Sequence, residues 1–118
     1  MGQPLITLDA TLMARRGILA AGTRTRGVIS WTNEVGVTTA SVSYEADLTD
    51  PEHSLLRLRF SSIGPDGARR QVDQMVPVTT TRPGLGGLRY WFLEDSRRVA
   101  QLRLAPGGVL FQSRATQD

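Results

Sequence analysis

The chain has 118 residues, a length that suits one domain with a hydrophobic core of its own. It contains no cysteine and one histidine, which excludes disulfide bonds, thiolate metal sites and cysteine nucleophiles. All 14 basic residues are arginine and 11 residues are acidic, so the formal net charge is +3. Arginine presents a planar fork of donors suited to phosphate, carboxylate and aromatic partners, although the codon usage of a GC-rich genome would explain the same composition.

The sequence also gives no sign of a membrane or secreted protein. No basic region followed by an apolar core opens the chain, and the apolar runs are about five residues long, far shorter than a membrane span. We therefore expect a soluble, cytoplasmic protein without a metal or other cofactor.

The first part of the single domain, residues 1–24, is expected to form an arm and one short helix. Asp9 is a candidate N-cap for a helix over residues 10–16, and Gly17 is a candidate stop. The packing contacts of this segment are expected from Leu12, Met13, Ile18 and Leu19.

Between residues 25 and 80 apolar and polar residues alternate with a period of two, which predicts a four-stranded antiparallel meander. The strands are expected at residues 27–32, 37–46, 55–61 and 69–78. In the third strand Leu56, Leu58 and Phe60 should face inward. Pro77 lacks a ladder donor, so the fourth strand should lie at an edge or end near that residue.

Charged residues of the third and fourth strands are expected on one solvent-exposed face, where cross-strand ion pairs would form. They are Arg57, Arg59, Arg69 and Asp73. Residues 79–87, rich in threonine and glycine, are interpreted as a linker to the C-terminal part.

The C-terminal part, residues 88–114, is predicted to form a separate three-stranded sheet. Two apolar runs flank the polar triplet Glu94-Asp95-Ser96, which is typical of a hairpin turn, and Val109-Leu110-Phe111 would return as the third strand. Residues 82–118 carry six arginines against three acidic residues. A polyanion would therefore be expected to bind here.

Catalytic chemistry is not indicated. His53 lies in a turn-like segment, residues 50–54, where an ordinary loop residue is expected rather than a catalytic base. The glycines of residues 84–87 lack the lysine and the following helix of a phosphate-binding loop. Five acidic residues also fall in expected turns: Asp47, Asp50, Glu52, Glu94 and Asp95. We therefore predict that the protein is not an enzyme.

A series of short motifs runs through nearly the whole chain. They are Leu8-Asp9, the short basic helix ending at Gly17, Gly27 to Trp31, Val72-Asp73-Gln74-x-Val76-Pro77, Gly86-Gly87, Trp91-Phe92, Arg97-Arg98-Val99-Ala100 and Phe111. In this order the motifs resemble a widespread group of small bacterial prophage proteins that have no assigned biochemical activity.

This resemblance implies a zinc ribbon at the C-terminal end. Members of the group carry a Cys-Pro-x-Cys-Gly knuckle after Trp-Phe-x and a Cys-x-x-Cys knuckle after the final aromatic residue. Here Glu94-Asp95-Ser96 replaces the first knuckle, and the second pair falls on Ser113 and Thr116. The resemblance therefore implies a degenerate ribbon that folds without metal.

We expect a non-enzymatic, phage- or mobile-element-encoded protein that binds nucleic acid, or a nucleic-acid-handling complex, through an arginine and aromatic β face. The candidate contact residues are Arg89, Tyr90, Trp91, Arg97, Arg98, Arg103 and Arg114. Two alternatives stay open: an anti-CRISPR-type inhibitor that docks on a host nuclease or effector, and a decayed prophage product without a partner. An exposed strand edge, near Pro77 or in the terminal sheet, would also allow a homodimer.

Overall fold

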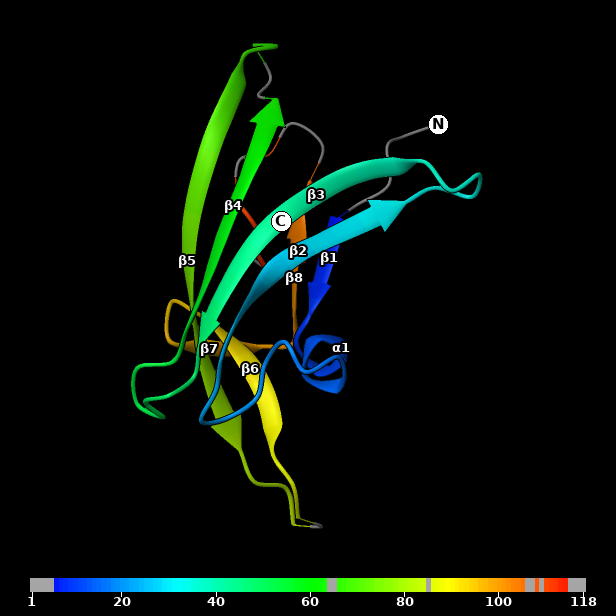
Figure 1. Ribbon diagram of the computed structural model, residues 1–118. Coiled ribbons are helices and arrows are strands. Elements are labelled where there is room, and N and C mark those ends of the chain that lie inside the picture. Colours follow the sequence, from blue (N-terminus) through cyan, green and yellow to red (C-terminus); the bar gives the residue numbers. More distant parts are fainter. Residues whose placement is uncertain (1–5, 64–65, 85, 106–107, 109, 115–118) are drawn as a thin grey trace.

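The computed structural model describes residues 6–63, 66–84, 86–105, 108 and 110–114 (Figure 1). Within these residues the chain forms one helix and eight strands. In chain order they are β1 (Ile6–Asp9), α1 (Ala10–Arg15), β2 (Arg24–Thr32), β3 (Thr38–Asp47), β4 (Leu55–Ile63), β5 (Arg69–Thr81), β6 (Arg89–Glu94), β7 (Arg97–Val99) and β8 (Gln101–Leu104). The prediction of a mainly β protein with one short N-terminal helix is confirmed.

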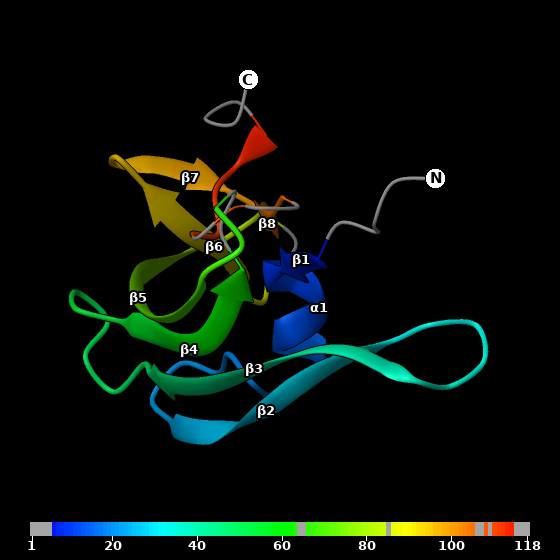
Figure 2. The same ribbon diagram turned by 90° about the horizontal axis from the view of Figure 1, so that it is seen from above.

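The strands pair in two antiparallel groups. Among the described residues, β2 to β7 form a six-stranded sheet in sequence order, and β1 pairs with β8. Figure 2 shows the six-stranded sheet curling around β1, β8 and α1. The sheet therefore has a concave face, which holds the hydrophobic core, and a convex face turned to solvent.

Helix α1 begins where the sequence predicts. The Leu12 N–H donates to Asp9 Oδ1 at 3.0 Å, which makes Asp9 the N-cap, and Gly17 adopts a φ of +76° that suits glycine. Met13 is buried with 4% of its surface exposed, but Leu12 is 43% exposed. The expected packing of Leu12 is wrong because so short a helix turns one face to the core, and neighbouring residues point about 100° apart.

The alternation predicted for the third strand is confirmed in β4. Leu56 and Leu58 are fully buried and Phe60 is 6% exposed, whereas Arg59 between them is exposed. The same period continues across β3 and β5, where Val42 and Val76 point into the core. One face of the meander is thus apolar and the other polar.

Strand β5 changes its partner along its length. Residues 69–77 pair with β4, and residues 78–81 pair with β6. The Val78 N–H donates to the Ser54 carbonyl at 2.9 Å, so the nitrogen of Pro77 points to the opposite edge, because successive N–H groups alternate between edges. Pro77 therefore ends the ladder between β5 and β6, and the strand itself continues to Thr81.

This change of partner corrects the predicted boundary. The expected linker at residues 79–87 begins inside β5, and β6 and β7 extend the meander instead of forming a separate sheet over residues 88–114. The physical reason is that the three threonines after Pro77 are β-branched and supply a paired edge for β6.

The expected third strand of the C-terminal sheet is also wrong. After Val99 the chain turns away from β6, and the Ala100 carbonyl accepts a hydrogen bond from the Ala10 N–H at 2.9 Å. Strand β8 then pairs with β1, where Leu8 lies opposite Leu102 and both are buried. Leu110 and Phe111 are not in a strand, while Val109 and Thr116 lie outside the described residues.

Phe111 instead closes the concave side of the sheet. Its ring packs edge-to-face on Phe60 with centroids 5.3 Å apart, and it is 2% exposed. The side-chain amide of Gln74 accepts from the Phe111 N–H at 2.8 Å and donates to the Phe111 carbonyl at 2.9 Å. Gln112 pairs with Arg103 of β8 through two backbone bonds. The C-terminal segment thus connects β5 to β8.

Replacing Phe111 by alanine should cost about 3–5 kcal/mol of unfolding free energy, because it opens a cavity under the curled sheet. Urea unfolding followed by circular dichroism measures this loss. The matched control is Leu110→Ala, because Leu110 is 44% exposed and its truncation should change stability little. Equal losses from the two variants would contradict the closing role of Phe111.

Asp9 makes the stability depend on pH. Burial raises the pKa of Asp9, but hydrogen bonds from Gln101 and from the Leu12 N–H outweigh it and hold that pKa below its ordinary value. Asp9→Ala should therefore cost about 0.5–2 kcal/mol at neutral pH. Because the folded pKa is lowered, this difference is present above the ordinary pKa and disappears as pH falls through the folded value.

Unfolding of wild type and variant between neutral and acidic pH checks this dependence. Asp9→Asn keeps the helix cap without a titrating group. The difference in unfolding free energy between Asp9→Asn and Asp9→Ala should therefore stay constant with pH. If the difference in unfolding free energy between wild type and Asp9→Ala stayed constant down to low pH, the role of the ionised carboxylate would be refuted.

Candidate functional site

The C-terminal hairpin adds an aromatic and basic patch to the convex face. Along β6, Arg89 and Trp91 point to the convex side, while Phe92 points into the core. Trp91 lies opposite Thr79, and its indole N–H donates to Thr81 Oγ1 at 2.9 Å. The change of partner in β5 therefore fixes the position of the indole.

Two guanidinium groups lie over this indole. The central guanidinium carbon lies 4.1 Å from the ring centroid of Trp91 in Arg89 and 5.8 Å in Arg98. At exposed sites each such contact contributes about 0.5–1 kcal/mol. Within the described chain, neither arginine has a carboxylate at ion-pair distance. We call Arg89, Trp91 and Arg98 the Trp91 stack.

The turn between β6 and β7 sets the place of Arg98. Asp95 and Ser96 both have positive φ, at 49° and 66°, which is the backbone of a tight two-residue hairpin. This geometry places Arg98 opposite Leu93, on the same face as Trp91. The predicted hairpin at Glu94-Asp95-Ser96 is confirmed.

The other predicted contact residues do not join the stack. The Tyr90 hydroxyl accepts from the Ala21 N–H at 2.9 Å, and its ring packs against the core. Arg97 lies opposite Glu94, on the other face from Trp91, with 3.8 Å between their charged atoms. Arg103 belongs to β8, and Arg114 is exposed beyond it. The structure therefore brings together three of the seven predicted residues.

The arginines of β2 to β4 differ because carboxylates accompany them. Arg57 donates to both oxygens of Asp73, at 2.9 and 2.5 Å, and Arg59 lies 3.9 Å from the same carboxylate. The hydrogen bond from Arg57 holds the pKa of Asp73 below its usual range. Arg24 pairs with Asp47 at 3.1 Å. The predicted cross-strand ion pairs are confirmed for Arg57 and Arg59, whereas no ion pair of Arg69 is found among the described residues.

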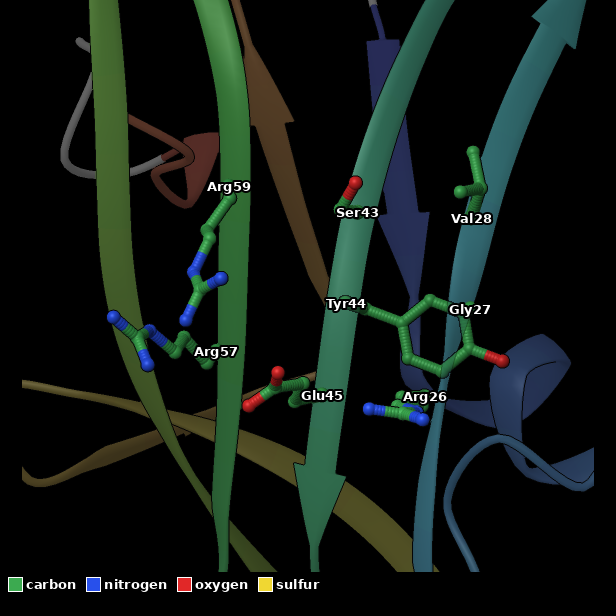
Figure 3. Close-up of a pocket in the computed structure, with 8 residues that line it drawn as sticks. All are labelled: Arg26, Gly27, Val28, Ser43, Tyr44, Glu45, Arg57 and Arg59. Carbon is green, nitrogen blue, oxygen red and sulfur yellow. The ribbon is translucent and has the colours of Figure 1, made fainter.

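A shallow hollow of about 350 Å³ lies over this charged region. Figure 3 shows Glu45 of β3 between Arg26 of β2 and Arg57 of β4. The hollow is lined by Arg26, Gly27, Val28, Ser43, Tyr44, Glu45, Arg57 and Arg59. Because Glu45 lies between the guanidinium groups of Arg26 and Arg57, the hollow is a weaker anion site than the Trp91 stack.

Sequence reasoning missed Thr81, the residue that holds the indole. No local sequence pattern predicts the contact between Thr81 and Trp91, because the contact depends on the register between β5 and β6. His53 behaves as the loop residue that was expected: its Nδ1 lies 2.8 Å from Asp50 Oδ2, and both side chains are exposed.

Comparison with known proteins gives no relative. No family model, curated protein or solved structure matches the chain. In the described part of the chain, no three histidine, aspartate or glutamate side chains cluster so as to hold a metal ion. Nor does any helix there have the length and apolar character needed to cross a lipid bilayer.

Removing the guanidinium of Arg89 should expose one face of the indole to water. In a Trp31→Phe background, where Trp91 is the remaining tryptophan, Arg89→Ala should shift the fluorescence emission to longer wavelength. Arg59→Ala is the matched control, because Arg59 pairs with Asp73 instead of contacting the indole. An unchanged emission in Arg89→Ala would show that Arg89 does not cover Trp91 in solution.

Proposed function

We propose that the protein is a non-enzymatic, cytoplasmic binding protein that contacts nucleic acid, or a nucleic-acid-handling complex, through the Trp91 stack. The observation that carries this proposal is the pair of guanidinium groups, without carboxylate partners in the described chain, over one partly exposed indole. Guanidinium groups bind phosphate, and unpaired bases stack on guanidinium planes as well as on aromatic side chains.

The surroundings of the stack fit a single strand better than a duplex. The face is a β-sheet surface that carries an aromatic side chain, and unpaired bases stack on aromatic side chains of such surfaces, whereas the bases of a duplex are already stacked on one another. Arg82, which is exposed, follows Thr81 directly and adds a cation at the same end of the sheet. A strand would run from Arg82 across Trp91 to Arg98.

Binding of labelled single-stranded DNA and RNA, measured by fluorescence anisotropy over a series of salt concentrations, tests the proposal. The double variant Arg89→Ala with Arg98→Ala should weaken binding at least tenfold. It should also reduce the slope of log affinity against log salt by about 1.4, since each phosphate contact on a single strand contributes about 0.7. Trp91→Ala should weaken binding roughly tenfold through lost stacking.

The control removes the same charge from the same face. Arg57→Ala with Arg59→Ala deletes two arginines whose charge Asp73 partly offsets, so affinity and salt slope should change less. If the two double variants lost the same affinity, the loss would be an effect of net charge alone. The Trp91 stack would then be excluded as the binding site. Absence of salt-dependent binding to every strand tested would remove nucleic acid as the partner.

A protein-binding inhibitor of the anti-defence type is the second candidate. It is favoured by Val35 and Val37, which are 82% and 57% exposed on the hairpin of β2 and β3 that projects from the body in Figure 1. A host partner retained from lysate after nuclease treatment, and lost on Val35→Ser with Val37→Ser, would favour this function over nucleic-acid binding.

The prophage origin and the ribbon ancestry remain part of the proposal. Glu94 and Ser113 stand at the two positions that the resemblance assigns to the metal knuckles, and Glu94 accepts hydrogen bonds from both the N–H and the hydroxyl of Ser113. These contacts support a ribbon closed without metal. The residues do not fit zinc, since the chain has no cysteine and its histidine lies in the loop before β4.

A further inference from the structure

We propose that the protein forms a homodimer in which the free edge of β2 pairs with β2 of a second copy. The two strands run antiparallel, with the two-fold axis at Val28. This inference is independent of nucleic-acid binding, because it uses a different edge of the molecule from the Trp91 stack.

The backbone groups available at this edge follow from the ladder with β3. The Leu48 N–H donates to the Thr23 carbonyl at 2.9 Å, so Leu48 points toward β2, and every second residue of β3 does the same. Their partners, which include Gly27 and Ile29, use their N–H and C=O groups inside the sheet. The groups of Arg24, Arg26, Val28 and Ser30 therefore point away from β3, and within the described chain only β3 pairs with β2.

The sequence of β2 is self-complementary about Val28. When Val28 lies opposite Val28 of the second copy, Arg26 lies opposite Ser30, so no like charges face each other. Each of these pairs has both backbone groups turned to the partner, which gives a regular antiparallel ladder. An axis at Arg26 would instead bring two guanidinium groups together, which is unfavourable in a cross-strand pair.

The exposure of the strand agrees with this register. Val28 is 61% exposed on the convex face of this edge strand, and a second copy of β2 would give it a cross-strand neighbour. On the concave face, Ile29 would lie opposite Gly27, whose missing side chain is replaced by the ring of Tyr44. The dimer would therefore add an apolar contact on both faces of the ladder.

The other strand edges are less suited to pairing. The edge near Pro77, which the sequence suggested for a homodimer, lacks a donor at Pro77, and on its concave side the Gln74 side chain is bonded to the backbone of Phe111. Strand β7 has three residues and offers few groups. Strand β2 has nine residues, no proline, and a regular register up to Trp31.

Sedimentation equilibrium over a range of concentrations tests the dimer. Because strand pairing buries less surface than a standard interface, we expect a dissociation constant of roughly 1–100 μM. Val28→Lys places two ammonium groups at the axis, and Val28→Pro removes the donor that points to the partner; each should raise this constant at least tenfold. Met75→Lys is the control: it adds the same charge at a residue 51% exposed on β5, three strands away.

Amide hydrogen exchange gives a readout that does not depend on the variants. The N–H groups of Arg26, Val28 and Ser30 should exchange rapidly in dilute protein and more slowly at concentrations above the dissociation constant. Those of Gly27 and Ile29 should be protected at both concentrations by β3. A monomer of 12.9 kDa at every concentration, or protection of Val28 that does not change with concentration, would overturn the proposal.

Discussion

The change of partner in β5 is the constraint on which the rest of the structure depends. A strand that paired with β4 throughout would leave the C-terminal hairpin to find its own core, which a two-stranded unit rarely achieves. Because residues 78–81 pair with β6 instead, Phe92 enters the common core and Trp91 joins the convex face. Pro77 marks the change of partner, since its missing N–H ends the ladder at that edge. One residue without a donor thus determines where the candidate site begins.

The sequence predicts those features of the fold that depend on residues close together in the chain. The helix cap at Asp9, the alternation in β4 and the hairpin at Asp95 and Ser96 depend on neighbours a few residues apart, and the sequence predicted all three. The pairing of β1 with β8 joins segments at opposite ends of the chain, and no local pattern encodes it. The same holds for the contact of Gln74 with Phe111. The sequence therefore predicted the helix and the strands of the meander, but it assigned the C-terminal strands to the wrong sheets and placed a strand at Leu110 and Phe111, where the structure has none.

At the candidate site, the sequence alone does not show which arginines are paired with carboxylates. Composition places six arginines in the last third of the chain, but only the fold distinguishes those that carboxylates neutralise from those that are available. Arg57 and Arg59 share Asp73 across adjacent strands, so their charge is partly compensated on the surface. Arg89 and Arg98 meet an indole instead, which holds their orientation without removing their charge. An anion would therefore find preoriented donors at β6 and β7 and compensated ones at β4.

The closure of the concave side also bears on this site. The Glu94 side chain is 15% exposed, a low value for a carboxylate, and bonds from the Ser113 N–H and hydroxyl, with Arg97 nearby, offset its loss of water. Glu94 directly precedes the tight turn that places Arg98 over Trp91. The segment that carries Phe111 into the core thus also fixes the residue from which this turn starts. Loss of the Ser113 contact would free the start of the turn, so the order of the Trp91 stack depends on a segment that does not touch it.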